Sequence, residues 1–206
     1  MKKLYYMALT VAGILSAAAA LAAMAERTET AVSGGVLRFH VLANSDAESD
    51  QALKLRVRDA VLAAAEPLLA ESGSAEQSAE IIGNNLELIE TAARAEIAAG
   101  GFAYHVRARV TRDVFPTKEY GGARFPSGEY TALRVEIGEA AGRNWWCVMF
   151  PPLCFARTDG GEMPEESKAK LEESLPDDAY SLVTGDGAGI RVKFKLVELL
   201  GELSKH

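Results

Sequence analysis

Hydrophobic and polar positions divide the chain into an apolar first segment and a longer part in which the periods of strands and helices alternate. Residues 4–25 carry no charge, whereas residues 26–35 are polar and end in two glycines, which predicts a linker. Residues 36–43 are mostly apolar, with β-branched and aromatic members. This pattern predicts a buried strand.

Two long helices are predicted after this strand. Apolar residues recur every three or four positions over residues 50–68, and Pro67 predicts the end of this helix or a kink in it. The residues that offer candidate N-caps are Asn44, Ser45, Asp46 and Ser49. The second helix begins at Ser74 with the capping-box pattern Ser-Ala-Glu-Gln and ends at Gly100-Gly101.

Alternating apolar and polar residues predict strands in the next part of the chain. Residues 104–110 alternate with a basic outer face, and residues 133–137 alternate in the same way. A short loop joins the second of these runs to the apolar residues 145–150, and this pair is typical of a hairpin. We therefore expect a single α+β domain in which two long helices pack on one face of a mostly antiparallel sheet.

The pattern after residue 152 is acidic and mixed. Residues 164–175 predict a short exposed helix, and residues 177–189 are rich in Asp and Gly, which favours a mobile segment. Residues 192–203 fit either a helix or a strand, and we interpret them as a helix. The domain is expected to cover residues 36–206, of which residues 157–206 have the weakest pattern.

Residues 1–25 have the features of a signal peptide or a membrane anchor. Lys2 and Lys3 precede the 22 uncharged residues 4–25, a length that also spans a bilayer. Residues 23–25 match the Ala-x-Ala cleavage pattern, and we favour cleavage over retention as an anchor or a buried helix. With cleavage or with anchoring, the domain lies outside the cytoplasm of the cell that makes it.

Net charge excludes one class of function. The 206 residues carry a formal net charge of −7, and without Lys2 and Lys3 there remain 20 basic residues against 29 acidic ones. Binding to nucleic acid needs a surplus of basic side chains that face phosphate. We therefore expect no nucleic-acid partner.

The two cysteines, Cys147 and Cys154, predict a disulfide in an exported chain, and the alternative is a pair of buried free thiols. A free Cys147 with His105 or His40 as its base would make a thiol-dependent hydrolase. The chain has none of the motifs of phosphate-binding loops, nucleophile elbows or zinc-protease helices. We therefore expect no catalytic residue, no cofactor and no metal.

Aromatic residues and prolines are concentrated in residues 115–152. Rigid aromatic side chains and fixed proline backbones are typical of partner surfaces. The residues that we predict for such a surface are Phe115, Pro116, Tyr120, Phe125, Tyr130, Trp145 and Trp146. The alternative is a loop folded over its own hydrophobic cluster. The neighbouring tryptophans of a strand would point to opposite faces of its sheet.

Five segments together resemble one known family. They are residues 41–46 (VLANSD), 51–61 (QALKLRVRDAV), 115–122 (FPTKEYGG), 125–135 (FPSGEYTALRV) and 144–154 (NWWCVMFPPLC). In this order, over residues 36–155, the chain resembles the stage II sporulation protein R family of endospore-forming bacteria.

This resemblance implies an exported signalling protein without chemistry of its own. Members of the family are made in the forespore and cross into the space between the two septal membranes. There they trigger a membrane-embedded aspartic protease of the mother cell, which processes the precursor of sigma factor E. The implied partner is that protease, with transient or anchored membrane association through residues 4–25. A less specific alternative to this signalling role is a binding domain of the cell envelope.

Overall fold

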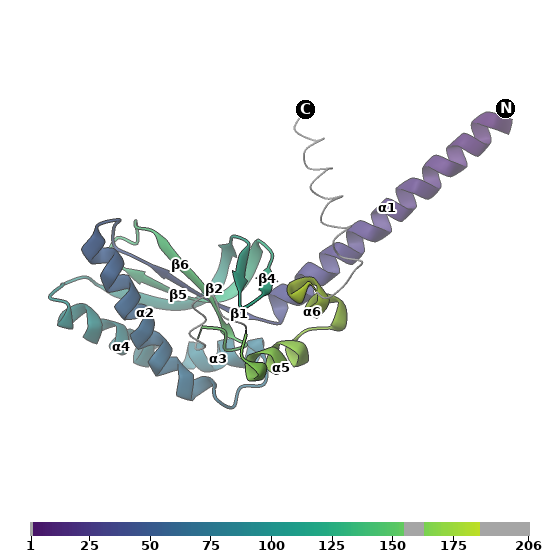
Figure 1. Cartoon of the computed structure of the whole chain (residues 1–206). Helices are drawn as coiled ribbons and strands as arrows, with labels where there is room; N and C mark the ends of the chain where they lie inside the picture. The colour runs from purple at the N-terminus through teal and green to yellow at the C-terminus, as the bar shows by residue number, and fades with distance from the viewer. Residues whose placement is uncertain (1, 155–162, 186–206) are drawn as a thin grey trace.

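A four-stranded sheet forms the centre of the computed structural model, which describes residues 2–154 and 163–185 (Figure 1). Its strand order is β2-β5-β1-β6, in which β1 runs parallel to β5 and the other two pairs are antiparallel. The strands are β1 (Leu37–Leu42), β2 (Val106–Phe115), β5 (Gly128–Ile137) and β6 (Asn144–Phe150). The expected α+β fold with a mostly antiparallel sheet is confirmed.

The hairpin predicted from residues 133–137 and 145–150 is wrong, because β1 lies between these two strands. Strands that follow one another along the chain usually pair. Here every residue of β1 is buried, so this strand takes a neighbour on each edge and β5 and β6 are separated. The antiparallel neighbour of β5 is β2, with an unbroken register over ten residue pairs.

The loop between β5 and β6 crosses the end of β1. The backbone N–H of Ala141 donates to Asn44 O at 3.2 Å, and that of Gly142 donates to Ala43 O at 3.0 Å. These two hydrogen bonds hold the crossing close to the backbone of β1.

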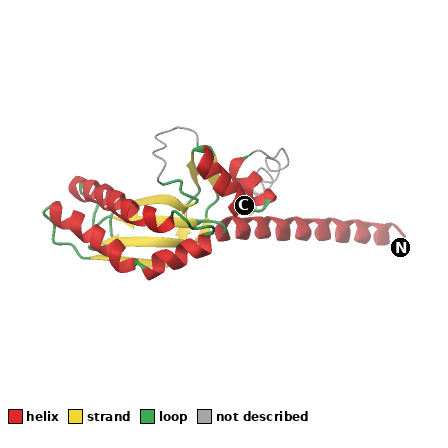
Figure 2. Ribbon diagram, turned by 90° about the horizontal axis from the view of Figure 1, so that it is seen from below, coloured by secondary structure: helices red, strands yellow, loops and turns green. Residues whose placement is uncertain are grey.

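Three helices cover one face of the sheet, which we call the helix face (Figure 2). They are α2 (Glu48–Leu69), α3 (Ala75–Asn84) and α4 (Leu86–Ala99). The second predicted helix is therefore two helices, with a break at Asn85, where φ is −121°. The Ser74 cap is confirmed, since its side chain accepts a hydrogen bond from Gln77 N. Buried residues of this layer include Phe39, Val41, Leu53, Val57, Ile89 and Leu133.

The opposite face of the sheet, which we call the hairpin face, is covered by a small hairpin and by parts of three helices. The hairpin, β3 (Lys118–Tyr120) with β4 (Ala123–Phe125), is inserted between β2 and β5. The predicted helix over residues 164–175 is confirmed as α5 (Glu165–Ser174). Residues 177–184, predicted to be mobile, instead form α6 (Asp177–Thr184). Residues 186–189 and 192–203 lie outside the described part of the chain.

Helix α1 (Lys2–Gly34) projects from the sheet as one continuous rod (Figures 1 and 2). Residues 26–34, predicted as a linker, are its last turns. They pack on the domain, because Val32 is buried and the Thr28 hydroxyl donates to Asp178 Oδ2 at 2.8 Å. Polar residues here form a helix because the domain supplies packing that local composition does not reveal. The stretch Tyr5–Gly34 is long and apolar enough to cross a membrane, as a signal sequence also is.

Replacing Gly142 by alanine is predicted to lower the free energy of unfolding by about 1–3 kcal/mol, because the new Cβ would overlap the carbonyl oxygen of Ser45. Urea denaturation followed by circular dichroism measures this loss. The matched control is Gly73→Ala, whose Cβ meets only the Gln77 side chain at 3.7 Å. Equal stability of the two variants would contradict the crossing of this loop over β1.

Candidate functional site

The hairpin face of β1 carries two buried polar side chains, Arg38 and His40. Side chains of a strand alternate between the faces of its sheet, so these two point away from the helices while Leu37, Phe39 and Val41 point toward them. Each of the two polar side chains has its own surroundings. Aromatic rings enclose Arg38, and a ladder of charged groups adjoins His40.

The guanidinium of Arg38 is fully buried and has no carboxylate partner in the described part of the chain. Its Nη2 donates to the Tyr120 hydroxyl at 3.3 Å, whereas Nε and Nη1 make no hydrogen bond within that part. Four rings surround it, with centroid distances of 4.3 Å for Phe115, 5.0 Å for Tyr130, 5.6 Å for Phe125 and 5.7 Å for Tyr120. Their negative faces offset part of the cost of removing the cation from water. We call these five residues the Arg38 cage.

Burial lowers the pKa of Arg38, although the two cage tyrosines act in the opposite direction. Burial also raises the pKa of Tyr130 to about 12, and it raises that of Tyr120. Both tyrosines therefore remain neutral at physiological pH, and their hydroxyls stay available as hydrogen-bond donors. Tyr120 uses its hydroxyl to donate to Trp146 O at 3.0 Å, which ties the hairpin to β6.

The cage corrects part of the predicted partner surface. Phe115, Phe125 and Tyr130 are buried in the cluster around Arg38 and do not face a partner. These three residues fit the alternative interpretation from the sequence, in which the loop folds over its own hydrophobic cluster. The remaining members of the predicted surface are Pro116, which is exposed, and Tyr120, Trp145 and Trp146, which are half-buried.

The two tryptophans lie on opposite faces of the sheet, as expected for neighbours on a strand. Trp145 is on the helix face, with the guanidinium of Arg58 4.9 Å from its ring centroid. Trp146 is on the hairpin face, where its ring stacks on His40 with centroids 3.7 Å apart. A single flat partner surface on the hairpin side can reach Trp146 but not Trp145.

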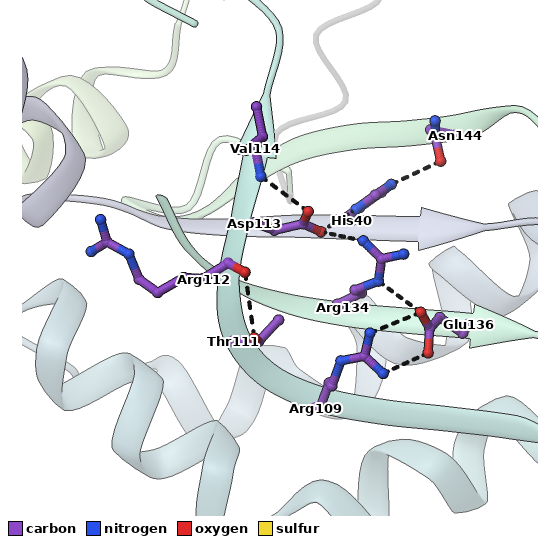
Figure 3. Close-up of polar contacts among 9 residues, drawn as sticks. All are labelled: His40, Arg109, Thr111, Arg112, Asp113, Val114, Arg134, Glu136 and Asn144. Carbon is purple, nitrogen blue, oxygen red and sulfur yellow. Dashed lines mark hydrogen bonds and ion pairs between the residues drawn. The ribbon is translucent and has the colours of Figure 1, made fainter. Parts of the chain in front are cut away.

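Five charged or polar side chains from β1, β2 and β5 form a continuous ladder (Figure 3). His40 Nδ1 lies 2.6 Å from Asp113 Oδ2, which also accepts a hydrogen bond from Arg134 Nη1 at 2.7 Å. Arg134 Nε continues to Glu136 Oε1 at 2.8 Å. Glu136 then receives both terminal nitrogens of Arg109, at 2.7 and 2.9 Å. The ladder cross-links three strands on the part of the sheet that the hairpin leaves open.

Burial lowers the pKa of His40, while its hydrogen bonds with Asp113 and Asn144 act in the opposite direction. The net lowering keeps the imidazole neutral at physiological pH. Burial also acts to raise the pKa of Asp113, but the hydrogen bonds from His40 and Arg134 outweigh it, and the pKa of Asp113 is lowered. The carboxylate is therefore ionised and the ring is not.

An Asp–His pair is also found in hydrolase triads, but the third position here is an amide. His40 Nε2 lies 2.9 Å from Asn144 Oδ1, so neither a hydroxyl nor a thiol occupies the place of a nucleophile. Cys147 pairs with Phe39 in the β1–β6 register and points to the helix face, away from His40. His105 is exposed, just before β2.

The structure joins Cys147 and Cys154 in a disulfide. The bridge links β6 to the turn that follows it, where Cys154 N donates to Val148 O at 3.0 Å. A bridged Cys147 has no thiolate, so the thiol-dependent hydrolase lacks its nucleophile in this structure. Within residues 2–154 and 163–185, no three His, Cys, Asp or Glu side chains are grouped to hold a metal ion.

A second polar cluster, which the sequence patterns did not single out, lies where β1 passes into α2. Asp50 is buried and accepts hydrogen bonds from Asn44 Nδ2 at 2.8 Å, Ser45 Oγ at 2.6 Å and Tyr104 OH at 3.1 Å. These bonds, with those from Ser45 and Asn44 the strongest, lower the pKa of Asp50 despite its burial.

The residues predicted to cap the helix over residues 50–68 form other hydrogen bonds. No side chain caps α2, whose N-cap residue is Ala47. Asn44 and Ser45 donate to Asp50 instead, and Ser45 Oγ also accepts from Ala47 N at 3.1 Å. The Asp50 cluster joins the start of α2 to the strand ends, and its role is structural. The close spacing of Asn44, Ser45 and Asp50 was the one sequence signal that could have revealed this cluster.

A half-open cavity of about 330 Å³ lies where the end of α2, β6 and α5 meet. Met149, Phe150 and Leu69 give it apolar walls. Two of its charged groups, Lys170 and Glu166, form an ion pair at 3.4 Å. It contains none of the residues of the predicted surface, the Arg38 cage or the ladder.

Comparison with known proteins identifies the chain. The family model described as stage II sporulation protein R matches residues 33–159. The chain belongs to this family. The stage II sporulation protein R of Bacillus subtilis (strain 168) is 32% identical over 191 residues, which cover 86% of this chain and 85% of that protein. That alignment is longer than residues 36–155, which contain the motifs. No solved structure matches the chain.

The match with the stage II sporulation protein R family spans four of the features described above. The ladder, the Arg38 cage, the Asp50 cluster and the disulfide lie within residues 33–159. Membership of this family supports a signalling role in sporulation. The apolar helix α1 is compatible with a signal peptide or an anchor.

Stability is predicted to fall as the pH is lowered from about 7 to about 5, in part because of His40. Unfolded histidine takes up a proton near pH 6.5, whereas folded His40 resists protonation because its pKa is lowered. The unfolded state therefore binds more protons in this range, and the free energy of unfolding decreases as pH falls. Urea denaturation at a series of pH values measures the slope.

The pH slope should be smaller in His40→Gln than in the native chain, and His105→Gln, which replaces an exposed histidine, is the matched control. Comparing slopes removes the loss of stability that His40→Gln causes at every pH. A His40→Gln slope equal to that of the native chain would contradict the assignment.

Proposed function

We propose that this chain is an exported sporulation signal that binds the outer part of a membrane-embedded aspartic protease and thereby leads to processing of the sigma factor E precursor. Membership of the stage II sporulation protein R family carries the proposal. Two observations support it. Helix α1 has the length and hydropathy of an export signal or anchor, and the two ring nitrogens of His40 face a carboxylate and an amide.

A protein without chemistry activates an enzyme by binding its active conformation more tightly than its inactive one. Such a ligand needs a surface of fixed shape, since ordering a flexible surface on binding costs affinity. The Arg38 cage and the Tyr120–Trp146 hydrogen bond provide this rigidity on the hairpin face. We place the partner surface there, around Pro116, Tyr120 and Trp146.

The position of α1 suits a partner in a membrane. If residues 4–25 remain as an anchor, the bilayer is separated from β1 by residues 35 and 36 and by the last helical residues, 26–34. At 1.5 Å per helical residue these span about 14 Å. Because this part of the helix also packs on the domain through Val32, the hairpin face would be held near the membrane surface. If residues 1–25 are removed, the same face is free to diffuse across the intermembrane space of the septum.

Deletion of the gene is predicted to leave the sigma factor E precursor unprocessed in sporulating cells. Immunoblotting of the precursor and its product over time measures this. Re-expression of the full chain in the forespore should restore processing, whereas a chain without residues 1–25 should not, because it stays in the cytoplasm. Processing on schedule in the deletion strain would rule out the proposed function.

A further inference from the structure

The outer edge of β2 is a strand edge that no other strand of the described chain covers. In an antiparallel pair the N–H and C=O of one residue point to the same side, and successive residues alternate. The Ala108 N–H donates to Glu90 Oε1 of α4 at 2.8 Å, and so it points away from β5. The register with β5 is unbroken, so Val110, Arg112 and Val114 also direct their backbone groups outward.

Side chains satisfy the ends of this edge and one carbonyl in its middle, where Thr111 Oγ1 donates to Arg112 O at 3.4 Å. Glu90 takes the Ala108 N–H, and Asp113 Oδ1 accepts from the Val114 N–H at 3.0 Å (Figure 3). Between them, the outward N–H groups of Val110 and Arg112 and the Val110 carbonyl have no hydrogen-bond partner within the described residues. They are spaced as in a strand ladder.

Two side chains along the same edge are exposed: Arg112 carries the kind of charge that usually protects an edge strand, whereas Val114 is apolar. Val114 is 68% exposed, more than any other large apolar residue described outside α1. Arg112 is 57% exposed and pairs at 3.0 Å only with the equally exposed Glu129, a pair that contributes little to stability. No bulge interrupts the register and no proline occurs within β2. Such an edge favours the addition of another strand.

We propose that the outer edge of β2, from Val110 to Val114, binds an extended segment of the partner protein, which adds a strand to the sheet. The proposal rests on the proposed function, because the partner meant here is the membrane protease. Only an extended backbone offers N–H and C=O groups at the spacing of this ladder. An acidic side chain facing Arg112 and an apolar one beside Val114 complete the fit.

Charge supports a partner segment rather than a second copy of the chain. The chain carries a net charge of −7, yet β2 has three arginines and one aspartate, and that aspartate is held by His40 and Arg134. A second copy would bring its own Arg112 against this one in a symmetric antiparallel pair. The edge also leads directly into Pro116 on the hairpin side, so one partner can contact both.

The test compares Arg112→Pro with Arg112→Ala, each expressed in the deletion strain. Proline removes the outward N–H and leaves the β2–β5 ladder intact, because the inward groups belong to the neighbouring residues. Alanine removes the same side chain but keeps the N–H. We expect Arg112→Pro to reduce precursor processing at least about tenfold relative to Arg112→Ala, the ratio expected for the loss of about 1.4 kcal/mol of binding free energy.

Equal processing by the two variants would overturn the proposal. If Arg112→Pro fails to accumulate, Val114→Glu replaces it, since an exposed site tolerates substitution and the new carboxylate repels an acidic segment. Full processing by Val114→Glu would likewise overturn it. Sedimentation velocity that shows a dimer lost in Arg112→Pro would assign the edge to a second copy and overturn it too. Failure of the proposed function is distinct, because the deletion strain itself would then process the precursor.

Discussion

Burial of both faces of β1 is the constraint on which the rest of the structure depends. Its apolar residues pack under α2, α3 and α4, as in many α+β domains. Its other face carries Arg38 and His40, and a buried cation without compensation costs several kcal/mol. The hairpin face must therefore supply aromatic rings at one end and an acidic partner at the other. The β3–β4 hairpin and Asp113 meet these two needs.

The motifs that identify the family are largely determinants of this fold. Residues 41–46 provide donors to Asp50, and the two Phe-Pro segments contribute all four rings that enclose Arg38. The segment 144–154 closes the far edge of the sheet with its disulfide. Val114, which precedes one of these motifs, and Pro116, which lies within it, are both exposed, so a partner can reach them. A signal of this kind presents a rigid edge and has no need of a reactive group.

Periodicity predicted the faces of the elements well but not their neighbours. The helix over residues 50–68 and the alternation of residues 104–110 correspond to α2 and β2, because burial on one face leaves a period in the sequence. Residues 36–43 correspond to β1, because burial on both faces leaves an apolar run. The insertion of β1 between β5 and β6 leaves no such trace, since pairing depends on distant segments. The break at Asn85 and the helical residues 26–34 are set by tertiary packing. Arg38 was missed because a basic residue in an apolar run indicates neither a cage nor its rings.

The proposed interface consists of the hairpin side of the sheet and the adjoining outer edge of β2, through which the protein binds a membrane protease. Photo-crosslinking in sporulating cells tests it most directly, with a photoreactive residue at Val114 on the β2 edge or at Leu88 on α4, both of which are exposed. We expect an adduct with the protease from position 114 and none from position 88. An adduct from position 88 and none from position 114 would contradict the proposed interface.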